Sequence, residues 1–243
     1  MSRPPRLSYA HAVHHVTLRC NNREFLFTDR SFALFLRILQ ETRARFPLRL
    51  YDYCLMTNHV HLLFKVGRDD TLSKAMHWLS TSFVRRFNKA AGRKGHLWEG
   101  RFRSTIIEEA TSFFRCLAYI DLNPVRARMA PTPLDYRWSG HRALRSEDAA
   151  QLDIHPLYLD LGPDPASRHR AYCELLAEEA AREPFTLATA YFLGSPAYVR
   201  RMELRFGLEG RAAGLRRRCL AGGLTCVGPL HGGSRGPKSY RSA

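Results

Sequence analysis

Residues 59–66, with the sequence HVHLLFKV, constrain the fold more than any other segment of the chain. Side chains of a β-strand point alternately to the two faces of a sheet. The apolar residues at the even positions therefore share one face, and His59, His61 and Lys65 share the other. The pattern predicts a strand that packs its apolar face on a core and presents two histidines together on the opposite face.

The His-x-His pair has two interpretations. Histidines two residues apart on one strand face lie about 7 Å apart at the backbone, and from that separation both imidazoles can reach one divalent cation. Two exposed surface histidines that bind nothing are the alternative. The amphipathic pattern and the preceding Asn58 favour a metal site, and the alternative stays open on this motif alone.

Local sequence signals predict the order strand, helix, strand, strand, helix, strand, helix. Asp29 is a good N-cap for the first helix, and Pro47 and Pro124 end or kink helices. The predicted elements cover residues 13–20, 29–46, 48–56, 59–66, 72–91, 102–109 and 110–122. This order predicts an α+β fold, a ferredoxin-like or RRM-like antiparallel sheet with helices on one face and the other face free.

The character of the sequence changes after about residue 135. Short helical segments broken by Pro and Gly follow, notably at residues 162–165, and the last 44 residues hold ten Arg or Lys against two Glu. We therefore expect a domain over residues 1–135 and a small helical basic C-terminal extension over residues 136–243, with a partly disordered tail.

Charge indicates the class of partner. The chain has 38 Lys and Arg against 22 Asp and Glu, a net charge of +16, which favours polyanionic phosphate over neutral small molecules. The six cysteines form no Cys-x-x-Cys pair, which argues against a zinc ribbon or redox motif built from neighbours and favours reduced thiols. No long apolar stretch and no signal peptide is found, so we expect a cytoplasmic protein with no membrane partner.

Residues 113–126 carry a second group of polar side chains. Helical spacing puts Tyr119 and Asn123 on one helix face, one turn apart, while apolar neighbours can point to the core. A phenol and an amide oxygen would then face the same volume. A core tyrosine, and an asparagine that N-caps a turn begun by Pro124, are the alternatives.

Together the two motifs resemble those of a known family. The segment MTNHVHLL at residues 56–63, followed by YIDLNPVRA at residues 119–127, resembles the single-tyrosine HUH transposases and, more narrowly, the REP-associated tyrosine transposases of bacteria. Supporting segments are HVTLR at residues 15–19, LWEGRF at 97–102 and DYRWS at 135–139. The motifs are specific when they occur in this order.

The resemblance implies a site and an activity. His59 and His61 would bind Mg²⁺ or Mn²⁺, Asn123 would supply the third protein ligand where many family members have Gln, and Tyr119 would be the nucleophile. The implied reaction is metal-dependent cleavage and rejoining of single-stranded DNA at hairpins of repetitive palindromes, through a 5′-phosphotyrosine intermediate. A nucleoid-associated bacterial protein that acts as a monomer or homodimer is also implied.

The chemistry of such a site is coherent. A tyrosine hydroxyl is mostly protonated at neutral pH and is a poor nucleophile, so a cation would polarise the phosphate and stabilise charge on the leaving 3′ oxygen. No residue is identified as the base that takes the phenolic proton. Lys65 is a candidate source of positive charge, with a solvated lysine as the alternative.

Basic residues interleaved with aromatic ones are suited to unpaired bases and to phosphates. Trp98 also has a second interpretation as a core anchor for the following strand, and the terminal arginines have one as solubilising charges. The predicted nucleic-acid contacts are Arg3, Arg6, Arg85, Arg86, Lys89, Arg93, Lys94, His96, Trp98, Arg101 and Arg103.

Three other functions are weighed against this one. A phosphoesterase with two His-x-Thr or His-x-Ser motifs would need a second copy of the motif at residues 15–17, and a histidine-triad nucleotide hydrolase would need a histidine where Leu63 stands. Neither requirement is met. A non-catalytic hairpin-binding protein is the main alternative, and the presence of all four candidate site residues argues against it.

Overall fold

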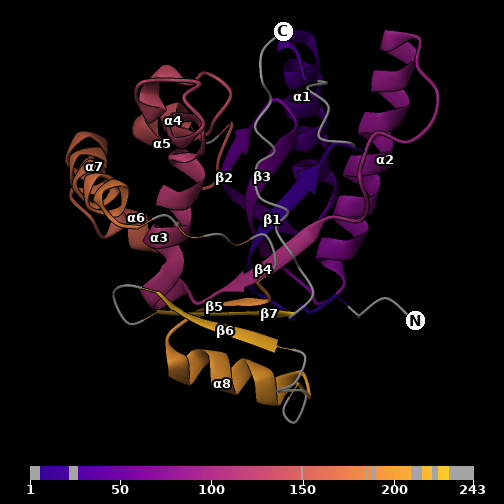
Figure 1. The fold of residues 1–243 in the computed structure, drawn as a ribbon. Coiled ribbons are helices and arrows are strands. Elements are labelled where there is room, and N and C mark those ends of the chain that lie inside the picture. The colour runs from indigo at the N-terminus through magenta and orange to yellow at the C-terminus, as the bar shows by residue number, and fades with distance from the viewer. Residues whose placement is uncertain are drawn as a thin grey trace, which may run out of the picture.

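The computed structural model describes most of the 243-residue chain. The described residues are 6–21, 27–148, 150–183, 185, 187, 190–208, 215–220 and 224–229. The strands are β1 (Val13–Arg19), β2 (Leu48–Leu55), β3 (His59–Val66), β4 (Arg103–Ile107), β5 (Phe192–Gly194), β6 (Leu215–Leu220) and β7 (Leu224–Pro229). They form one sheet in the order β2-β3-β1-β4-β5-β7-β6 (Figure 1). Neighbouring strands are antiparallel except β4 and β5, which are parallel.

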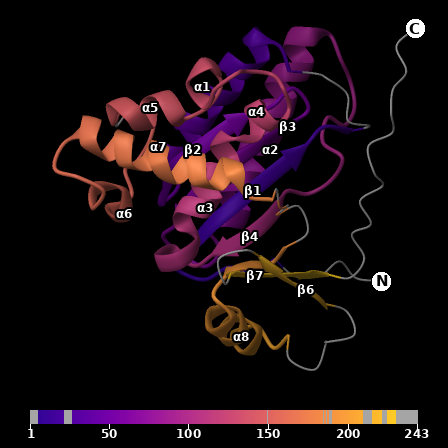
Figure 2. The ribbon, with the colours of Figure 1, turned by 60° about the vertical axis from the view of Figure 1, so that its left-hand side comes forward.

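Helices cover both faces of the sheet. The helices are α1 (Asp29–Arg45), α2 (Thr71–Ala91), α3 (Glu109–Asp121), α4 (Asn123–Arg126), α5 (His141–Ser146), α6 (Pro156–Leu159), α7 (Pro165–Ala181) and α8 (Pro196–Arg205). Figures 1 and 2 show α1 and α2 on one side of the sheet and α3, with α7 against it, on the other. No helix among the described residues has the length and apolar character to cross a membrane.

The predicted α+β class and antiparallel sheet are confirmed, and one detail is wrong. All helices were expected on one face, whereas α3 lies on the face of β3 that carries His61 and Lys65. The physical reason is that α3 has its own buried apolar stripe, which includes Phe113 and Leu117. That stripe packs on the sheet, so the histidine face is covered by the helix that carries Tyr119.

The opposite face of β3 lies in the core, as the alternation predicts. Val60, Leu62 and Phe64 have no exposed surface. On the same side, the rings of Phe35 and Phe83 from α1 and α2 meet with centroids 5.1 Å apart. Because this face is fully covered, the strand has no freedom to slip by one residue, and its histidines are held on the other face.

The C-terminal extension contains strands as well as helices, whereas its sequence predicts helices. Strand β5 pairs with β4 through Ile106 with Phe192 and Ile107 with Leu193, and β7 and β6 continue the sheet beyond it. The three residues of β5, with the sequence FLG, are too few to show the alternating pattern that predicts a strand. Within the last 44 residues, where a partly disordered tail is expected, the structure describes residues 200–208, 215–220 and 224–229, and the other residues lie outside the described part of the chain. The domain boundary at residue 135 stays a prediction.

Candidate active site

Strands β1 and β3 bring polar side chains onto one face of the sheet. The antiparallel register pairs Thr17 with His61 and Arg19 with His59. Directly paired residues point to the same face, and His15, two residues before Thr17, points there too. The predicted ligands therefore share a face with a histidine and an arginine from the neighbouring strand.

The imidazole ring of His61 lies against those of His15 and His59, and the phenol of Tyr119 lies against His15 and His61. His61 stacks on His15 with ring centroids 5.1 Å apart and meets His59 edge-on at 4.8 Å. The Tyr119 ring meets His15 and His61 edge-on, at 5.5 and 5.7 Å. Helix α3 thus brings the predicted nucleophile against one predicted ligand, His61, whose ring in turn meets the other, His59.

Hydrogen bonds fix which ring nitrogens are available. His59 Nδ1 lies 2.7 Å from Asn58 Oδ1, an acceptor, so Nδ1 carries the hydrogen and Nε2 carries the lone pair. His61 Nδ1 lies 2.8 Å from His15 Nε2. His61 Nε2 is buried and has no hydrogen-bond partner in the described part of the chain. A buried polar atom without a partner is costly, so a ligand bound at this atom would remove that cost.

Burial keeps these imidazoles neutral. Desolvation, with the positive charge of Arg19 nearby, lowers the pKa of His59 to about 3. Desolvation and the neighbouring His59 lower the pKa of His15 to about 3, and the same kinds of cause hold the pKa of His61 well below its ordinary value. Neutral imidazole is the form that binds a metal ion. The rings are therefore in their ligand form at neutral pH.

Asn123 lies just beyond α3 rather than inside it. Its Nδ2 donates to the carbonyl oxygens of Tyr119 and Ile120 at 2.6 and 3.4 Å, which satisfies acceptors at the end of the helix. It does not N-cap a turn begun by Pro124, because the N-cap of α4 is Leu122 and no side chain caps it. With Nδ2 engaged, Oδ1 is the amide atom left for a cation.

The donor set fits a divalent cation that accepts nitrogen and oxygen ligands. Two imidazole nitrogens and one amide oxygen fill three positions of an octahedral ion such as Mg²⁺ or Mn²⁺. The unpartnered His61 Nε2 supports a ligand at this place. The chemistry of the three side chains thus suits such an ion, which would have further positions for other ligands.

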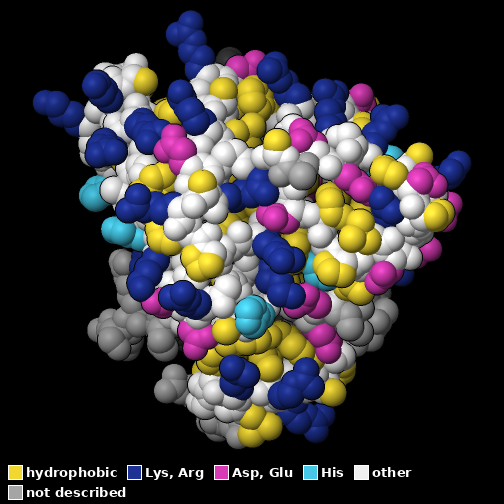
Figure 3. Space-filling view, turned by 180° about the vertical axis from the view of Figure 1, so that it is seen from behind, with side chains coloured by type: hydrophobic (Ala, Val, Ile, Leu, Met, Phe, Trp, Pro, Cys, Tyr) yellow, Lys and Arg dark blue, Asp and Glu magenta, His cyan; other side chains and the backbone are white. Residues whose placement is uncertain are grey.

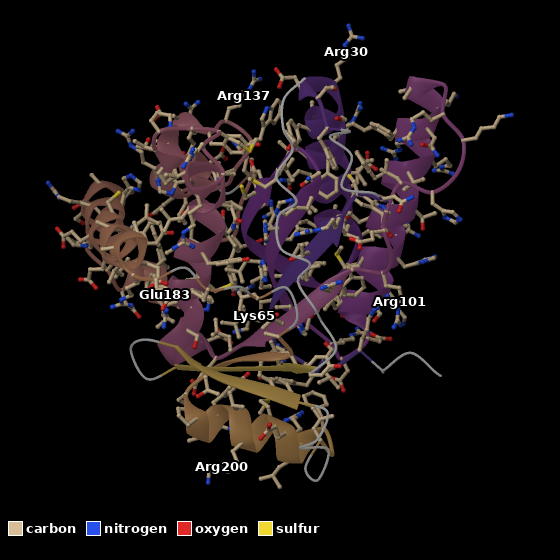
Figure 4. All side chains as sticks on the ribbon, viewed as in Figure 1. Arg30, Lys65, Arg101, Arg137, Glu183 and Arg200 are labelled. Carbon is tan, nitrogen blue, oxygen red and sulfur yellow. The ribbon has the colours of Figure 1, made fainter. Side chains whose placement is uncertain are left out.

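An ion-pair network holds the first turn of α3 against the sheet. The Lys65 ammonium and His155 Nε2 each lie 2.8 Å from Glu109 Oε2. Burial raises the pKa of Glu109, but the hydrogen bonds from His155 and Lys65 outweigh burial and hold that pKa below its ordinary value. Figure 4 shows Lys65 beside this end of α3. The interpretation of Lys65 as a solvated lysine is wrong, because its charge is paired with Glu109.

The predicted nucleic-acid residues differ in their exposure and in the contacts that they make. Arg86 forms a two-pronged ion pair with Glu41, both contacts at 2.8 Å. The Trp98 ring lies 5.6 Å from that of Phe83, which favours its interpretation as a core anchor over a stacking platform. Arg3 lies outside the described residues. The exposed side chains are Arg85, Lys89, Lys94, His96, Arg101 and Arg103.

The two remaining predicted arginines lie over aromatic rings. The guanidinium carbon of Arg6 is 4.0 Å from the centroid of Phe102, and that of Arg93 is 5.9 Å from the centroid of Phe87. These are cation–π distances. Figure 3 shows Lys and Arg side chains widely spread over the face seen from behind, with fewer Asp and Glu among them. Positive charge therefore extends well beyond the histidine cluster.

The basic loop after α2 adjoins the histidine cluster. The backbone amide of Glu99 donates to the carbonyl oxygen of Arg19 at 2.9 Å. Arg19 in turn pairs with His59 across the two strands. Residues 92–100, which carry the exposed Lys94 and the half-buried Arg93, therefore lie at the same end of the sheet as His59.

His15, Arg19 and Phe185 belong to this cluster although the site prediction does not include them. The available signal for the first two is the alternation at residues 15–19, which puts them on one strand face once β1 is paired with β3. Phe185 packs on Tyr119 with ring centroids 5.2 Å apart. Phe185 belongs to the C-terminal extension, and no local sequence pattern predicts a contact between residues so far apart in the sequence.

Comparisons with known proteins agree with this geometry. Residues 8–123 match the family model described as Transposase IS200 like. A Haemophilus influenzae protein described as a REP-associated tyrosine transposase is 25% identical over 119 residues, which is 44% of this chain and 68% of that protein. A solved structure of a REP-associated tyrosine transposase bound to a REP hairpin has a TM-score of 0.52 and 20% identity, and covers 68% of this chain and 93% of that one. The structural likeness shows a common fold.

Proposed function

Residues 8–123 match the model of the IS200-like transposases, and from this match we propose that the chain is a DNA transposase that cleaves and rejoins single-stranded DNA at repetitive palindromic hairpins. The reaction is metal-dependent and passes through a 5′-phosphotyrosine intermediate. One observation carries the proposal: the Tyr119 phenol contacts a cluster of buried, neutral histidines on one face of the sheet.

Tyr119 is the nucleophile of the proposed reaction. Its Oη forms a bond to the phosphorus of the scissile phosphodiester, and the bond from phosphorus to the 3′ oxygen breaks. The phenolic proton leaves to a base or to water, and the departing 3′ oxygen takes up a proton. The phosphotyrosine bond keeps the energy of the phosphodiester, so a 3′-OH can attack it and rejoin the strand.

His59, His61 and Asn123 are the proposed ligands of Mg²⁺ or Mn²⁺. When bound, such an ion polarises the phosphate and stabilises negative charge on the leaving oxygen. His15 holds the His61 ring by a 2.8 Å contact between His15 Nε2 and His61 Nδ1. Outer partners of this kind fix the tautomer and orientation of a ligand histidine, so we assign His15 as a positioning residue.

Single-stranded DNA suits this site, because base pairing would shield the phosphate from a phenol held on a helix. Arg19 beside His59, and the exposed Lys94 and Arg101, supply charge for the DNA backbone. The solved relative that is bound to a REP hairpin supports a hairpin as the partner. Such a substrate implies action at the bacterial nucleoid.

A labelled hairpin oligonucleotide with a single-stranded flank, mixed with the full chain and Mn²⁺ or EDTA, tests the proposed function on a denaturing gel. We expect a metal-dependent band that carries the mass of the protein and is absent from Tyr119→Phe, while that variant still binds the hairpin. Binding without a cut strand or an adduct in the wild type would instead support the non-catalytic hairpin-binding protein.

The same gel tests whether the site works within one chain. Tyr119 and the histidines belong to one protomer in this fold, which supports a monomer over a homodimer with shared helices. We expect a mixture of Tyr119→Phe and His61→Ala to stay inactive. Recovery of cleavage in the mixture would mean that a second copy supplies the tyrosine.

A further inference from the structure

We propose that His141, His169 and Cys173 bind a Zn²⁺ ion in the C-terminal extension. One ligand atom from each residue lies within 4.8 Å of the other two. His141 begins α5, and His169 and Cys173 lie one turn apart on α7. These residues take no part in the histidine cluster beneath Tyr119, so the proposal is independent of the proposed function.

The spacing on α7 fits a tetrahedral ion. His169 Nε2 lies 3.4 Å from Cys173 Sγ. Zinc binds nitrogen at about 2.0–2.1 Å and sulfur at about 2.3 Å, so a tetrahedral angle separates these two atoms by about 3.6 Å. The His141 ring faces His169 with centroids 5.3 Å apart. Small shifts of the partly buried His169 and Cys173 side chains would close the remaining ligand distances.

Asp121 orients the His141 ring. In many zinc sites a carboxylate that does not bind the metal holds a ligand histidine in the same way. Asp121 Oδ2 lies 2.8 Å from His141 Nδ1 and accepts a hydrogen bond from the Tyr172 hydroxyl at 2.6 Å. With Nδ1 held in this way, Nε2 is the His141 nitrogen left to bind an ion. His141 and Asp121 are 1% and 0% exposed, so packing fixes this arrangement.

His169 lacks the polar partners that would otherwise explain its position. Its Nδ1 is buried without a hydrogen-bond partner, and the contact recorded for its Nε2 within the described residues is the Cys173 thiol, a weak donor. Burial and the nearby His141 lower the pKa of His169 to about 4, so the ring is neutral at neutral pH. An ion shared with Cys173 and His141 would give Nε2 a stronger partner than the thiol.

The donor atoms select zinc over the ions expected beneath Tyr119. A thiolate and two imidazoles suit Zn²⁺, whereas Mg²⁺ prefers oxygen ligands. Three protein ligands leave the fourth position to water, which can enter because His169 and Cys173 are only partly buried. Through Asp121 the ion would tie α5 and α7 to α3 and so brace the helix that carries Tyr119 (Figure 2).

Cobalt binding to the full chain tests this site. Co²⁺ substitutes for Zn²⁺ and gives a near-ultraviolet charge-transfer band when a thiolate is a ligand. We expect one equivalent of Co²⁺ to produce the band and Zn²⁺ to remove it. Cys173→Ser should lose the band with an unchanged circular dichroism spectrum. His77→Ala, which removes an exposed histidine on α2, is the matched control and should keep the band.

A second variant guards against an effect on folding. Asp121→Asn keeps all three ligands and removes the outer carboxylate, so the dissociation constant for Zn²⁺ should rise about 10–100-fold. A wild-type chain without the thiolate band, or a band that persists in Cys173→Ser, would overturn the proposal. The three side chains would then be packed neighbours that bind no metal.

Discussion

Two histidine clusters lie on opposite sides of helix α3, and they are built in different ways. Tyr119 faces the first, whose rings stand on β1 and β3. Asp121 faces the second, whose side chains stand on the short helix α5 and on α7. In the first cluster the strand register and the hydrogen bonds of His59 and His61 hold the rings in place. In the second, helices joined by loops bring the side chains near one another; His141 is held by packing, whereas His169 and Cys173 are only partly buried.

The electrostatics of the two clusters also differ. In the first cluster His15 and His61 are buried and His59 is half-buried, and desolvation lowers the pKa values of His15 and His59 to about 3. Burial acts in the same direction on His141, but the Asp121 carboxylate outweighs it and holds the pKa of His141 above its ordinary value. Burial without a counter-charge thus keeps the imidazoles neutral, whereas a buried carboxylate orients the ring that it contacts.

The largest expected difference between the clusters is in catalysis. His61→Ala should lower the rate of hairpin cleavage by about 10²–10⁴-fold, because a bound cation supplies several kcal/mol of charge stabilisation. Cys173→Ser should leave that rate nearly unchanged. Single-turnover cleavage with both variants checks this. Equal losses in the two would contradict the separation of the clusters.

His15→Gln should have a smaller effect of a different kind. Loss of the hydrogen bond to His61 Nδ1 should raise the Mn²⁺ concentration needed for half-maximal cleavage by about 10–100-fold. Saturating Mn²⁺ should restore much of the rate, because the ligands themselves remain. His14→Gln, on the opposite face of the same strand, is the control. A loss of rate that saturating Mn²⁺ does not reverse would contradict the assignment of His15 as a positioning residue.

Acid should destabilise the fold through its buried histidines. Desolvation lowers the pKa of His14 to about 3, as it does for His15 and His59. Between the ordinary histidine pKa and that value the unfolded chain binds a proton that the folded chain excludes. Each such histidine therefore makes the free energy of unfolding fall by about 1.4 kcal/mol per pH unit as the pH drops.

Urea unfolding of the wild type and His14→Gln from pH 7 to pH 4.5 measures this slope. The variant should show a shallower decline. His141 contributes with the opposite sign, because its pKa is raised, so its stabilisation is present at low pH and is lost as the pH rises through that pKa. A stability that does not change over this range would refute the account of neutral buried rings.

The smallest expected effects concern the basic surface. Lys94→Ala should weaken hairpin binding and reduce the slope of log affinity against log salt by about 0.7. Arg86→Ala should leave that slope unchanged, because Arg86 is paired with Glu41, and should lower the free energy of unfolding by at most about 1 kcal/mol. Binding measured at several salt concentrations distinguishes the two. A larger salt effect from Arg86 would mean that its ion pair opens on DNA.

Much of the sheet domain could be predicted from local patterns. The alternation at residues 59–66 predicted β3, and the apolar spacing after Asp29 predicted α1, because both signals lie inside the element they describe. The N-cap of α1 is Thr28, which forms a capping box with Ser31, so the prediction that Asp29 is the N-cap is wrong by one residue. The side on which α3 lies could not be read in this way. It depends on which sheet face its buried stripe, including Phe113, finds uncovered.

The strands and contacts of the C-terminal extension could not be predicted either, because they also depend on contacts between segments that are distant in the sequence. Strand β5 is three residues long and exists through its pairing with β4, which is far away in the sequence. The contact of Phe185 with Tyr119, and the meeting of His141 with His169, are likewise products of packing between distant segments. A motif that lies within one strand or helix can be recognised in the sequence. A site whose residues are brought together by packing between distant segments cannot.

The central claim is that Tyr119 attacks the DNA. Mass spectrometry of proteolytic peptides, taken after the full chain has reacted with a hairpin oligonucleotide and Mn²⁺, tests it most directly. We predict that the peptide containing Tyr119 gains the mass of the 5′-phosphorylated DNA fragment, and that His61→Ala shows no such gain. A nucleotide on a peptide with a different tyrosine, or cleaved DNA without any peptide adduct, would contradict the account.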